Sequence, residues 1–582
     1  MSDVDWIIVG FYIVLVWAIG FWLSRRATRS TAEFFASGRG LPWWLIGTSM
    51  AASAFSSDTP HYVARLARES GVARNWEWWG VGIGGVLVAF IIAPLWRRVG
   101  VLTDLELIEL RYGGKAAAAL RGFRAVHTGL LFNVLTMAAP LAGMLLVVEA
   151  VVPEFPVQAL QFELGTALVL ATVLYSFFGG FWGVVVTDFL QFVIAMVAAV
   201  VLAVVAVDHA GGLDRVLEVA ARNVELQAFD FSVSSPDPWT EGLLPFLVFA
   251  LVQWWAFMNA DGGGKLVQRM VAAKNERHAV WGTLWFNVTH YALRTWPWVI
   301  VGLSSLVLLP DIEPRLAYAG TAAHVLPAGL LGLFVASFVA AYMSTVDTQL
   351  NWGSSYLVHD LYRRFLVRGR TESHYVGVAR LFTLLLGLGA VGMLALGDKE
   401  GGVTQYLRLA MRIGSGYGIA LLARWFWWRA TAVSEIVALA TAFAVTVAYH
   451  PRIGLMPAGH AYALKLLVTA GITGAAWLLS VLLLRVRAPD GLVDFYRRAR
   501  PPGWWGPVAA LAPDVQRRRL DGWRAGVCGL LLVFGLTLGL GGWLLGAAGT
   551  GVWAWLAVAA AGGLGVAFSA RGIGPQQGVA GP

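Results

Sequence analysis

Apolar stretches follow one another along almost the whole chain, each about 20 residues long and so able to cross about 30 Å of hydrocarbon as a helix. The sequence is 58% hydrophobic and 13% charged, whereas soluble proteins average about 25% charged residues. We therefore predict an all-α integral membrane protein that has the lipid bilayer as a partner. The expected spans, about fifteen in number, lie near residues 4–24, 41–64, 78–98, 126–151, 162–179, 182–207, 241–259, 279–309, 326–350, 376–396, 401–426, 430–449, 463–486, 525–546 and 552–570.

Charged residues in the loops predict how the chain is oriented. Arginine-rich segments such as SRRATRS and YRRFLVRGR fall on alternate loops, and such loops face the cytoplasm. We expect a multi-pass protein of the cell membrane with its N-terminus outside and its C-terminus in the cytoplasm. These arginines also explain the net charge of +9, so the charge indicates no nucleic-acid partner. The single cysteine, Cys528, excludes an intrachain disulfide.

Two expected spans contain a break in their helical pattern. In GTSMAASAFSSDTPHYV, a run rich in serine and threonine leads into Pro60, which lacks a backbone donor and disfavours helix just before it. In FMNADGGGKLVQR, Asp261 and three glycines interrupt the second span. Within lipid, the groups freed by a break need protein, water or an ion as partner. The breaks therefore predict a binding site, with ordinary kinks as the alternative.

The breaks fall in the first helix of two five-span blocks whose topologies are opposite. Corresponding interrupted helices in inverted repeats indicate the midplane binding site of a secondary transporter. The expected division is residues 1–40 as a first transmembrane helix and cytoplasmic loop, 41–207 as the first inverted repeat, 208–240 as an extracellular loop, 241–426 as the second inverted repeat, and 427–582 as additional transmembrane helices and a cytoplasmic loop.

The stretch AAYMSTVDTQLNW, residues 340–352, places Ser344, Thr345, Asp347 and Thr348 in one apolar helix. Asp347 and Thr348 lie three and four residues after Ser344, and therefore on its face. A carboxylate at this depth needs a cation, a proton or an arginine, while hydroxyls can simply bond the carbonyl four residues back. The pattern predicts a cation pathway, with self-bonded hydroxyls and a structural ion pair as the alternative.

Four motifs carry a family resemblance, in the expected order and spacing: FFASGRGLPWW at 34–44, GGFWGVVVTDFLQ at 179–191, VQRMVAAKNERHA at 267–279 and AAYMSTVDTQLNWGSSYLVHDLYRRF at 340–365. Together they resemble the sodium:solute symporter family over roughly residues 1–430. The resemblance implies a leucine-transporter-type fold, an inverted-repeat core of five plus five helices with one extra N-terminal helix and about four extra C-terminal helices.

The family's sodium site maps onto the two polar segments. The resemblance assigns Ala341, Ser344 and Thr345 as ligands, facing carbonyls freed by the first broken helix near Ala54 and Ser57. Hard cations prefer several oxygen ligands, and unwound carbonyls with hydroxyls supply them without a formal charge. Na⁺ is therefore the expected coupling ion and the only expected metal.

A second cation site, or the exit path of the first ion, is implied by the acid of the VVVTD motif. It would consist of Asp188, Ser344, Asp347 and Thr348. Two neighbouring carboxylates repel each other unless a cation or a shared proton lies between them, so a proton could take the place of the second ion.

The solute pocket is expected between the broken helices, and its candidate residues are Phe55, Ser56, Asp58, Trp254, Asn259 and Arg294. Arg294 follows His290 at helical spacing, and it could pair with Asp58, Asp261 or Asp347, or meet an anionic solute. His290 alone is more often a hydrogen-bonded core residue. Arg408 and Arg412 form a further pair, either facing outward or contacting solute.

The predicted function is import of a small organic solute, coupled to the sodium gradient by alternating access, by a protein that is not an enzyme and acts as a monomer. One alternative is a membrane-embedded enzyme acting on a lipid substrate, although the chain has no DxxD or HExxH motif. The other is a proton-coupled or sodium-sensing member of the same fold.

Overall fold

Helices account for the regular structure of the residues described by the computed structural model, namely 1–27, 39–157, 159–224, 243–256, 260–396, 402–449, 458–484, 490–515, 521–546 and 550–569. Within these ranges the chain forms two isolated β-bridges and no β-strand. Nine of the described helices are long and apolar enough to cross a membrane, and three apolar helices are shorter. The all-α membrane architecture is therefore confirmed.

The N-terminal half begins with α1 (Asp3–Ala27), which packs against two long helices of the bundle, α10 and α19. The helices that follow α1 are α3 (Trp43–Ser53), α4 (Asp58–Ser70), α5 (Trp76–Leu87), the π-helical η3 (Val88–Ile92), α6 (Ala93–Val99), α7 (Glu106–Tyr112), α8 (Gly114–Val126), the π-helical η4 (His127–Phe132), α9 (Asn133–Val151) and α10 (Gln161–His209).

The second half of the core contains a further set of helices in which π-helical segments recur. They are α11 (Leu213–Asn223), α13 (Leu243–Val248), η5 (Phe249–Gln253), α14 (Trp254–Ala256), α15 (Lys265–Ala272), α16 (Glu276–Asn287), η6 (Val288–Leu293), α17 (Thr295–Leu308), α18 (Ala317–Val325), α19 (Leu330–Ser355), η8 (Tyr356–Leu366), α20 (Glu372–Leu396) and α21 (Gly402–Phe426).

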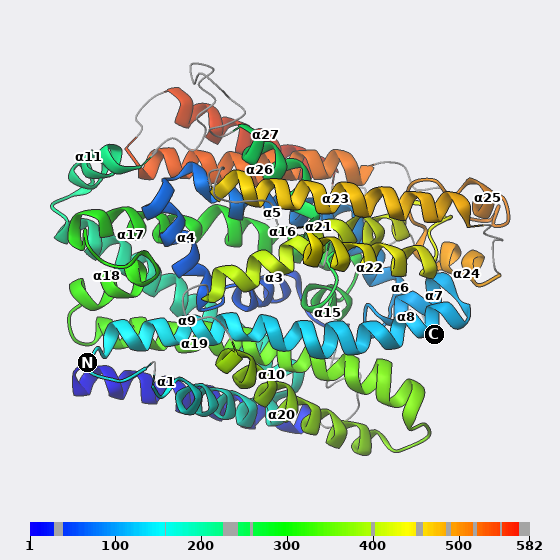
Figure 1. Cartoon of the computed structure of the whole chain (residues 1–582), viewed down its shortest axis with the longest axis horizontal. Helices are drawn as coiled ribbons and strands as arrows, with labels where there is room; N and C mark the ends of the chain where they lie inside the picture. The colour runs from blue at the N-terminus through cyan, green and yellow to red at the C-terminus, as the bar shows by residue number, and fades with distance from the viewer. Residues whose placement is uncertain are drawn as a thin grey trace.

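The C-terminal helices lie beside this core. They are α22 (Ala432–Ala448), α23 (Ala458–Leu483), α24 (Asp490–Ala499), α25 (Gly506–Ala509), α26 (Asp521–Leu544) and α27 (Thr550–Ser569). In Figure 1, α26 and α27 run along the edge of the bundle opposite α1, and α3 lies in the middle. The short helix α3 packs against α10, α16 and α19, so the first break is surrounded by protein.

The helix α10 differs from the sequence prediction. Two spans, 162–179 and 182–207, were expected, but the backbone is helical without interruption over 49 residues. The pair Gly179–Gly180 lies at the expected boundary, yet glycine weakens a helix by only about 1 kcal/mol per residue. No proline follows it to stop the helix. The expected separation of these two spans is therefore not seen.

Candidate functional site

The first helix break is present where the sequence predicts it. The helix α3 ends at Ser53 and α4 begins at Asp58. Ser57 Oγ donates to the carbonyl oxygen of Pro140 at 2.6 Å, which fixes the break against α9. On the same helix, Gly143 leaves room for the broken backbone, because a Cβ there would lie 2.6 Å from the Asp58 nitrogen.

We expect Gly143→Ala to lower the melting temperature of the detergent-purified protein. The new methyl group would meet backbone atoms of the break, which cannot rotate away, and overpacking of this kind costs about 1–3 kcal/mol. Gly377→Ala in α20 is the matched control, because a Cβ there meets nothing within 4 Å. Equal melting temperatures for Gly143→Ala and the unmodified protein would contradict the packing of the break against α9.

The second break lies between α14 and α15. The helix α14 ends at Ala256 and α15 begins at Lys265. Gly262 and Gly264 have φ angles of 79° and 70°, a left-handed region that side chains with a Cβ rarely adopt. The glycine run is therefore needed for the shape of this turn. The predicted pocket residue Asn259 lies outside the described residues.

Asp261 in this turn is held by the end of α21. Its Oδ2 accepts hydrogen bonds from Arg424 Nε at 2.9 Å and from Trp425 Nε1 at 2.8 Å. Its carbonyl oxygen accepts one from Trp96 Nε1 at 2.8 Å. Asp261 therefore neutralises Arg424, and the proposed pairing of Asp261 with Arg294 is wrong.

The polar middle of α19 reaches the first break. Thr345 Oγ1 donates to the carbonyl oxygen of Ser53 at 3.2 Å, and Ser53 is the last residue of α3. Thr345 thus contacts the residue that directly precedes Ala54, and Ala54 is the first residue of the break. The three α19 residues assigned to the sodium site are all buried: Ala341, Ser344 and Thr345.

Asp188 of α10 lies at the centre of a buried polar cluster. Its carboxylate accepts hydrogen bonds from Ser344 Oγ and Ser49 Oγ, both at 2.5 Å. Arg269 of α15 approaches the same carboxylate at 3.0 Å, and both side chains are completely buried. Arg269 also donates to Thr348 Oγ1 at 2.9 Å. Residues predicted to hold a second cation thus surround a guanidinium cation supplied by the protein.

Asp347, the fourth residue of this predicted set, has a different partner. Its Oδ1 accepts a hydrogen bond from Ser176 Oγ of α10, whereas Asp188 is bonded by Ser49, Ser344 and Arg269. The structure therefore brings Asp188, Ser344 and Thr348 together around Arg269, while Asp347 is hydrogen-bonded to Ser176 and also attracts the Arg269 guanidinium.

Arg294 lies against the first break without an acidic partner among the described residues. Its guanidinium donates to the carbonyl oxygen of Ala51 at 2.6 Å and contacts His290 Nδ1. It also stacks on Phe55 and Trp298, with 5.0 Å and 5.3 Å from the guanidinium carbon to the ring centres. The Nε atom is buried and makes no hydrogen bond to a described residue. Arg294 and Phe55 are therefore neighbours, as the predicted pocket requires.

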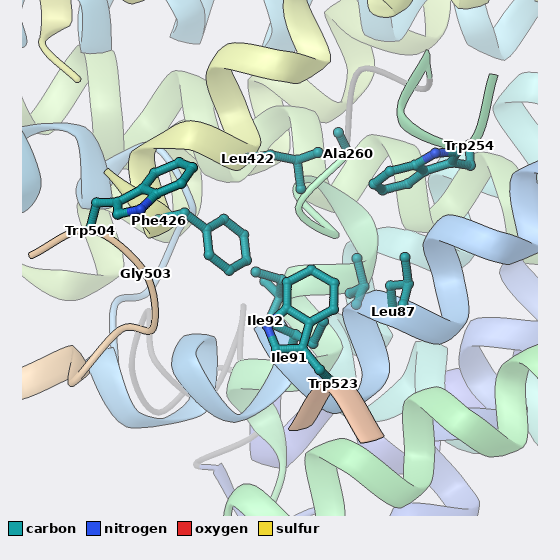
Figure 2. A pocket seen from close by; sticks show the side chains of 11 residues that line it. Leu87, Ile91, Ile92, Trp254, Ala260, Leu422, Phe426, Gly503, Trp504 and Trp523 are labelled. Atoms are coloured by element: carbon teal, nitrogen blue, oxygen red, sulfur yellow. The ribbon is translucent and has the colours of Figure 1, made fainter. Parts of the chain in front are cut away.

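The remaining pocket candidates fall in two places. Ser56 Oγ donates to the Asp58 carboxylate beside the break. Trp254 instead lines a cavity of about 390 Å³ together with Phe426 and Trp523 (Figure 2). The walls of this cavity are almost entirely apolar. Polar groups are needed to orient a hydrophilic solute, so we do not assign the solute to this cavity.

Arg408 and Arg412 do not behave as a pair. Arg408 Nε lies 3.0 Å from Glu77 Oε1, and Arg74 lies 2.8 Å from the same carboxylate. Arg412 donates instead to the backbone carbonyls of Val445 and Tyr449. Glu77 is completely buried, whereas Arg408 and Arg74 are partly exposed. The expected outward-facing pair of arginines is not seen, and contact of Arg408 with solute stays a prediction.

Three charged residues were missed by the sequence reasoning: Lys265, Arg269 and Glu77. Lys265 Nζ donates to the carbonyl oxygen of Ser53 at 2.9 Å. The sequence contains a signal for each of them. The lysine directly follows the glycine break, the arginine lies inside the VQRM motif, and the glutamate lies inside the apolar segment WEWWG. A charge in an apolar segment needs a partner, but the sequence does not say which one.

Two interrupted helices beside a hydroxyl-rich helix are features of known transporter folds. A solved structure of a Na⁺-coupled sialic acid symporter, in a substrate-bound outward-open state, superposes with a TM-score of 0.65. At 19% sequence identity it covers 84% of this chain, and the whole of that symporter is matched. The protein therefore has the leucine-transporter-type fold of multi-span membrane transporters.

A model of the sodium:solute symporter family matches residues 34–441, and the chain belongs to this family. A sodium/glucose cotransporter 4 of Danio rerio is 28% identical over 66% of this chain and 62% of its own length. A sodium/mannose cotransporter of Bos taurus is 27% identical over 69% of this chain and 71% of its own length. A sodium/glucose cotransporter of Vibrio parahaemolyticus is 23% identical over 78% of this chain and 86% of its own length. The match thus spans less than two thirds of the Danio rerio relative.

Proposed function

We propose that this protein is a secondary active transporter that imports a small organic solute, driven by the sodium gradient through alternating access. The observation that carries the proposal is the hydrogen bond from Thr345 to the Ser53 carbonyl, where the hydroxyl-rich α19 meets the first broken helix. Membership of the sodium:solute symporter family supports it. That membership leaves the alternative of a lipid-processing enzyme without support.

The coupling ion is proposed to bind between α19 and the first break. Its ligands would be carbonyl or hydroxyl oxygens of Ala54, Ser57, Ala341, Ser344 and Thr345. These groups suit Na⁺, because several neutral oxygens can replace its water ligands. Ser344 donates its hydroxyl hydrogen to the Asp188 carboxylate at 2.5 Å, whose charge is balanced by Arg269, so the lone pairs of the Ser344 oxygen can still face a cation. The residues present therefore fit a monovalent cation.

We propose that one sodium ion moves per cycle and that the second polar set serves as its exit path. The reason is the charge balance around Asp188, since Arg269 already supplies a buried positive charge to that carboxylate. An additional Na⁺ at Asp188 and Thr348 would lie against this guanidinium and be repelled by it.

Asp347→Asn tests this stoichiometry. The substitution keeps most of the hydrogen-bonding capacity and removes the charge. Reversal potentials in proteoliposomes should give the same sodium-to-solute ratio, close to one, for the variant and the unmodified protein. A ratio of two that falls toward one in Asp347→Asn would instead assign a second ion to this acid.

The solute is proposed to bind beside the first break, near Phe55, Ser56, Asp58 and Arg294, with Trp254 and Asn259 as further candidates. The relatives named for glucose and mannose favour a sugar-like solute. Aromatic faces and charged hydrogen-bonding groups beside one another suit a polyhydroxylated molecule, and the Arg294 guanidinium could donate to its oxygens.

The proposal is tested with purified protein in proteoliposomes. An inward sodium gradient should drive accumulation of labelled hexoses or related sugars, and the accumulation should collapse when the gradient is dissipated. Uptake that follows a proton gradient equally well without sodium would favour the proton-coupled alternative.

We further propose that the protein is a monomer in the cell membrane, with its N-terminus outside and its C-terminus in the cytoplasm.

A further inference from the structure

Lys265 places a positive charge of the protein at the first helix break. Its Nζ donates to the carbonyl oxygen of Ser53 at 2.9 Å, and the same oxygen accepts the Thr345 hydroxyl at 3.2 Å. Lys265 is the first residue of α15, directly after the second break. One carbonyl oxygen therefore joins the first broken helix, the second broken helix and α19.

Among the charged groups around Lys265, one acidic residue could serve as an alternative partner for its ammonium group. Asp58 and Asp188 attract it, while Arg269 and Arg294 repel it. Asp188 is already paired with Arg269. The Asp58 carboxylate accepts a hydrogen bond from Ser56 and makes no ion pair with a described residue. Asp58 thus offers the ammonium an acidic partner at the start of α4, across the break from Ser53.

We propose that the Lys265 ammonium repels Na⁺ from the site beside Ser53 and moves toward Asp58 when sodium binds. This inference rests on the proposed sodium-coupled transport. An ammonium group on the Ser53 carbonyl lies one residue along the chain from the proposed sodium ligand Ala54, so the two cations repel each other. Lysine carries its compact charge on a flexible four-carbon stem. Because Asp58 lies in the proposed solute pocket, the movement would make solute binding depend on sodium.

A purely structural role for Lys265 makes a different prediction. The Ser53 carbonyl ends a helix and lacks its helical partner, so a lysine could simply satisfy it. In that case removal of the ammonium would damage the break and weaken sodium binding. With the repulsion proposed here, removal of the ammonium strengthens sodium binding.

The experiment compares Lys265→Met with the unmodified full-length protein. Sodium is titrated while thermal stability is followed, and the midpoint of sodium-induced stabilisation gives the affinity. We expect Lys265→Met to bind sodium about tenfold more tightly and to bind solute with little dependence on sodium. Lys274→Met is the control, because it removes an exposed lysine from the loop after α15, and its sodium midpoint should not change.

Asp58→Asn provides a second measurement that does not depend on the folding of Lys265→Met. Without the alternative partner the ammonium should stay at Ser53, so sodium binding should weaken about tenfold. An unchanged or weakened sodium midpoint in Lys265→Met, or an unchanged midpoint in Asp58→Asn, would overturn the inference. Sodium-driven uptake by the unmodified protein is measured in parallel, because the absence of uptake would contradict the proposed function rather than the role of Lys265.

Discussion

Replacement of Arg269 by methionine is expected to remove most of the stability of the folded protein. Arg269 is completely buried and pairs with Asp188, and it also donates to Ser49 and Thr348. Removing one partner of a buried ion pair costs about 3–5 kcal/mol, because the other charge stays buried without compensation. The melting temperature and the yield of purified Arg269→Met should therefore fall sharply.

The double variant Arg269→Met/Asp188→Asn separates the charge from the packing. It removes both charges, so much of the lost melting temperature should return. Arg363→Met is the matched control, because Arg363 pairs with Glu372 where both side chains remain in contact with solvent, at 39% and 42% exposure. Exposed pairs contribute about 0–1 kcal/mol. Normal stability of Arg269→Met, or no recovery in the double variant, would contradict the role given to this pair.

The second large effect is expected from Ser344→Ala combined with Thr345→Ala. These changes remove two hydroxyl ligands of the proposed sodium site and the Thr345 bond to the Ser53 carbonyl. The sodium concentration for half-maximal solute uptake should rise at least about tenfold. Insertion into the membrane should remain normal, because alanine is tolerated in membrane helices at least as well as serine.

Ser354→Ala combined with Ser355→Ala is the control on the same helix. These hydroxyls donate to carbonyl oxygens three residues back in α19, so they contact no other helix through these bonds. Their loss should leave the sodium dependence of uptake unchanged. An unchanged sodium dependence in Ser344→Ala/Thr345→Ala would instead show that α19 does not hold the coupling ion.

The helix breaks could be predicted from the sequence because their causes are local. Pro60 removes a backbone donor, and the run Gly262–Gly264 allows the positive φ angles found in the second turn. The polar segment of α19 was also visible, since hydroxyls and a carboxylate interrupt an apolar run. These features predicted the parts of the site but not their exact contacts.

The pairing of charges could not be predicted, because it depends on how distant helices pack. Asp188 and Arg269 are 81 residues apart in the sequence, and Asp261 meets Arg424 across 163 residues. Arg294, for example, had Asp58, Asp261 and Asp347 as possible partners. Among the described residues, Arg294 has no acidic partner and donates to the Ala51 carbonyl instead. The Ser53 carbonyl accepts a hydrogen bond from Lys265. Packing rather than residue type decided these contacts.

Equilibrium binding of radiolabelled sodium to the purified protein measures directly whether α19 and the first broken helix hold the coupling ion. We expect saturable binding of one ion per chain in the unmodified protein and in Ser354→Ala/Ser355→Ala. In Ser344→Ala/Thr345→Ala, sodium should bind at least about tenfold more weakly. Equal sodium affinity in all three proteins would contradict a site between α19 and the first broken helix.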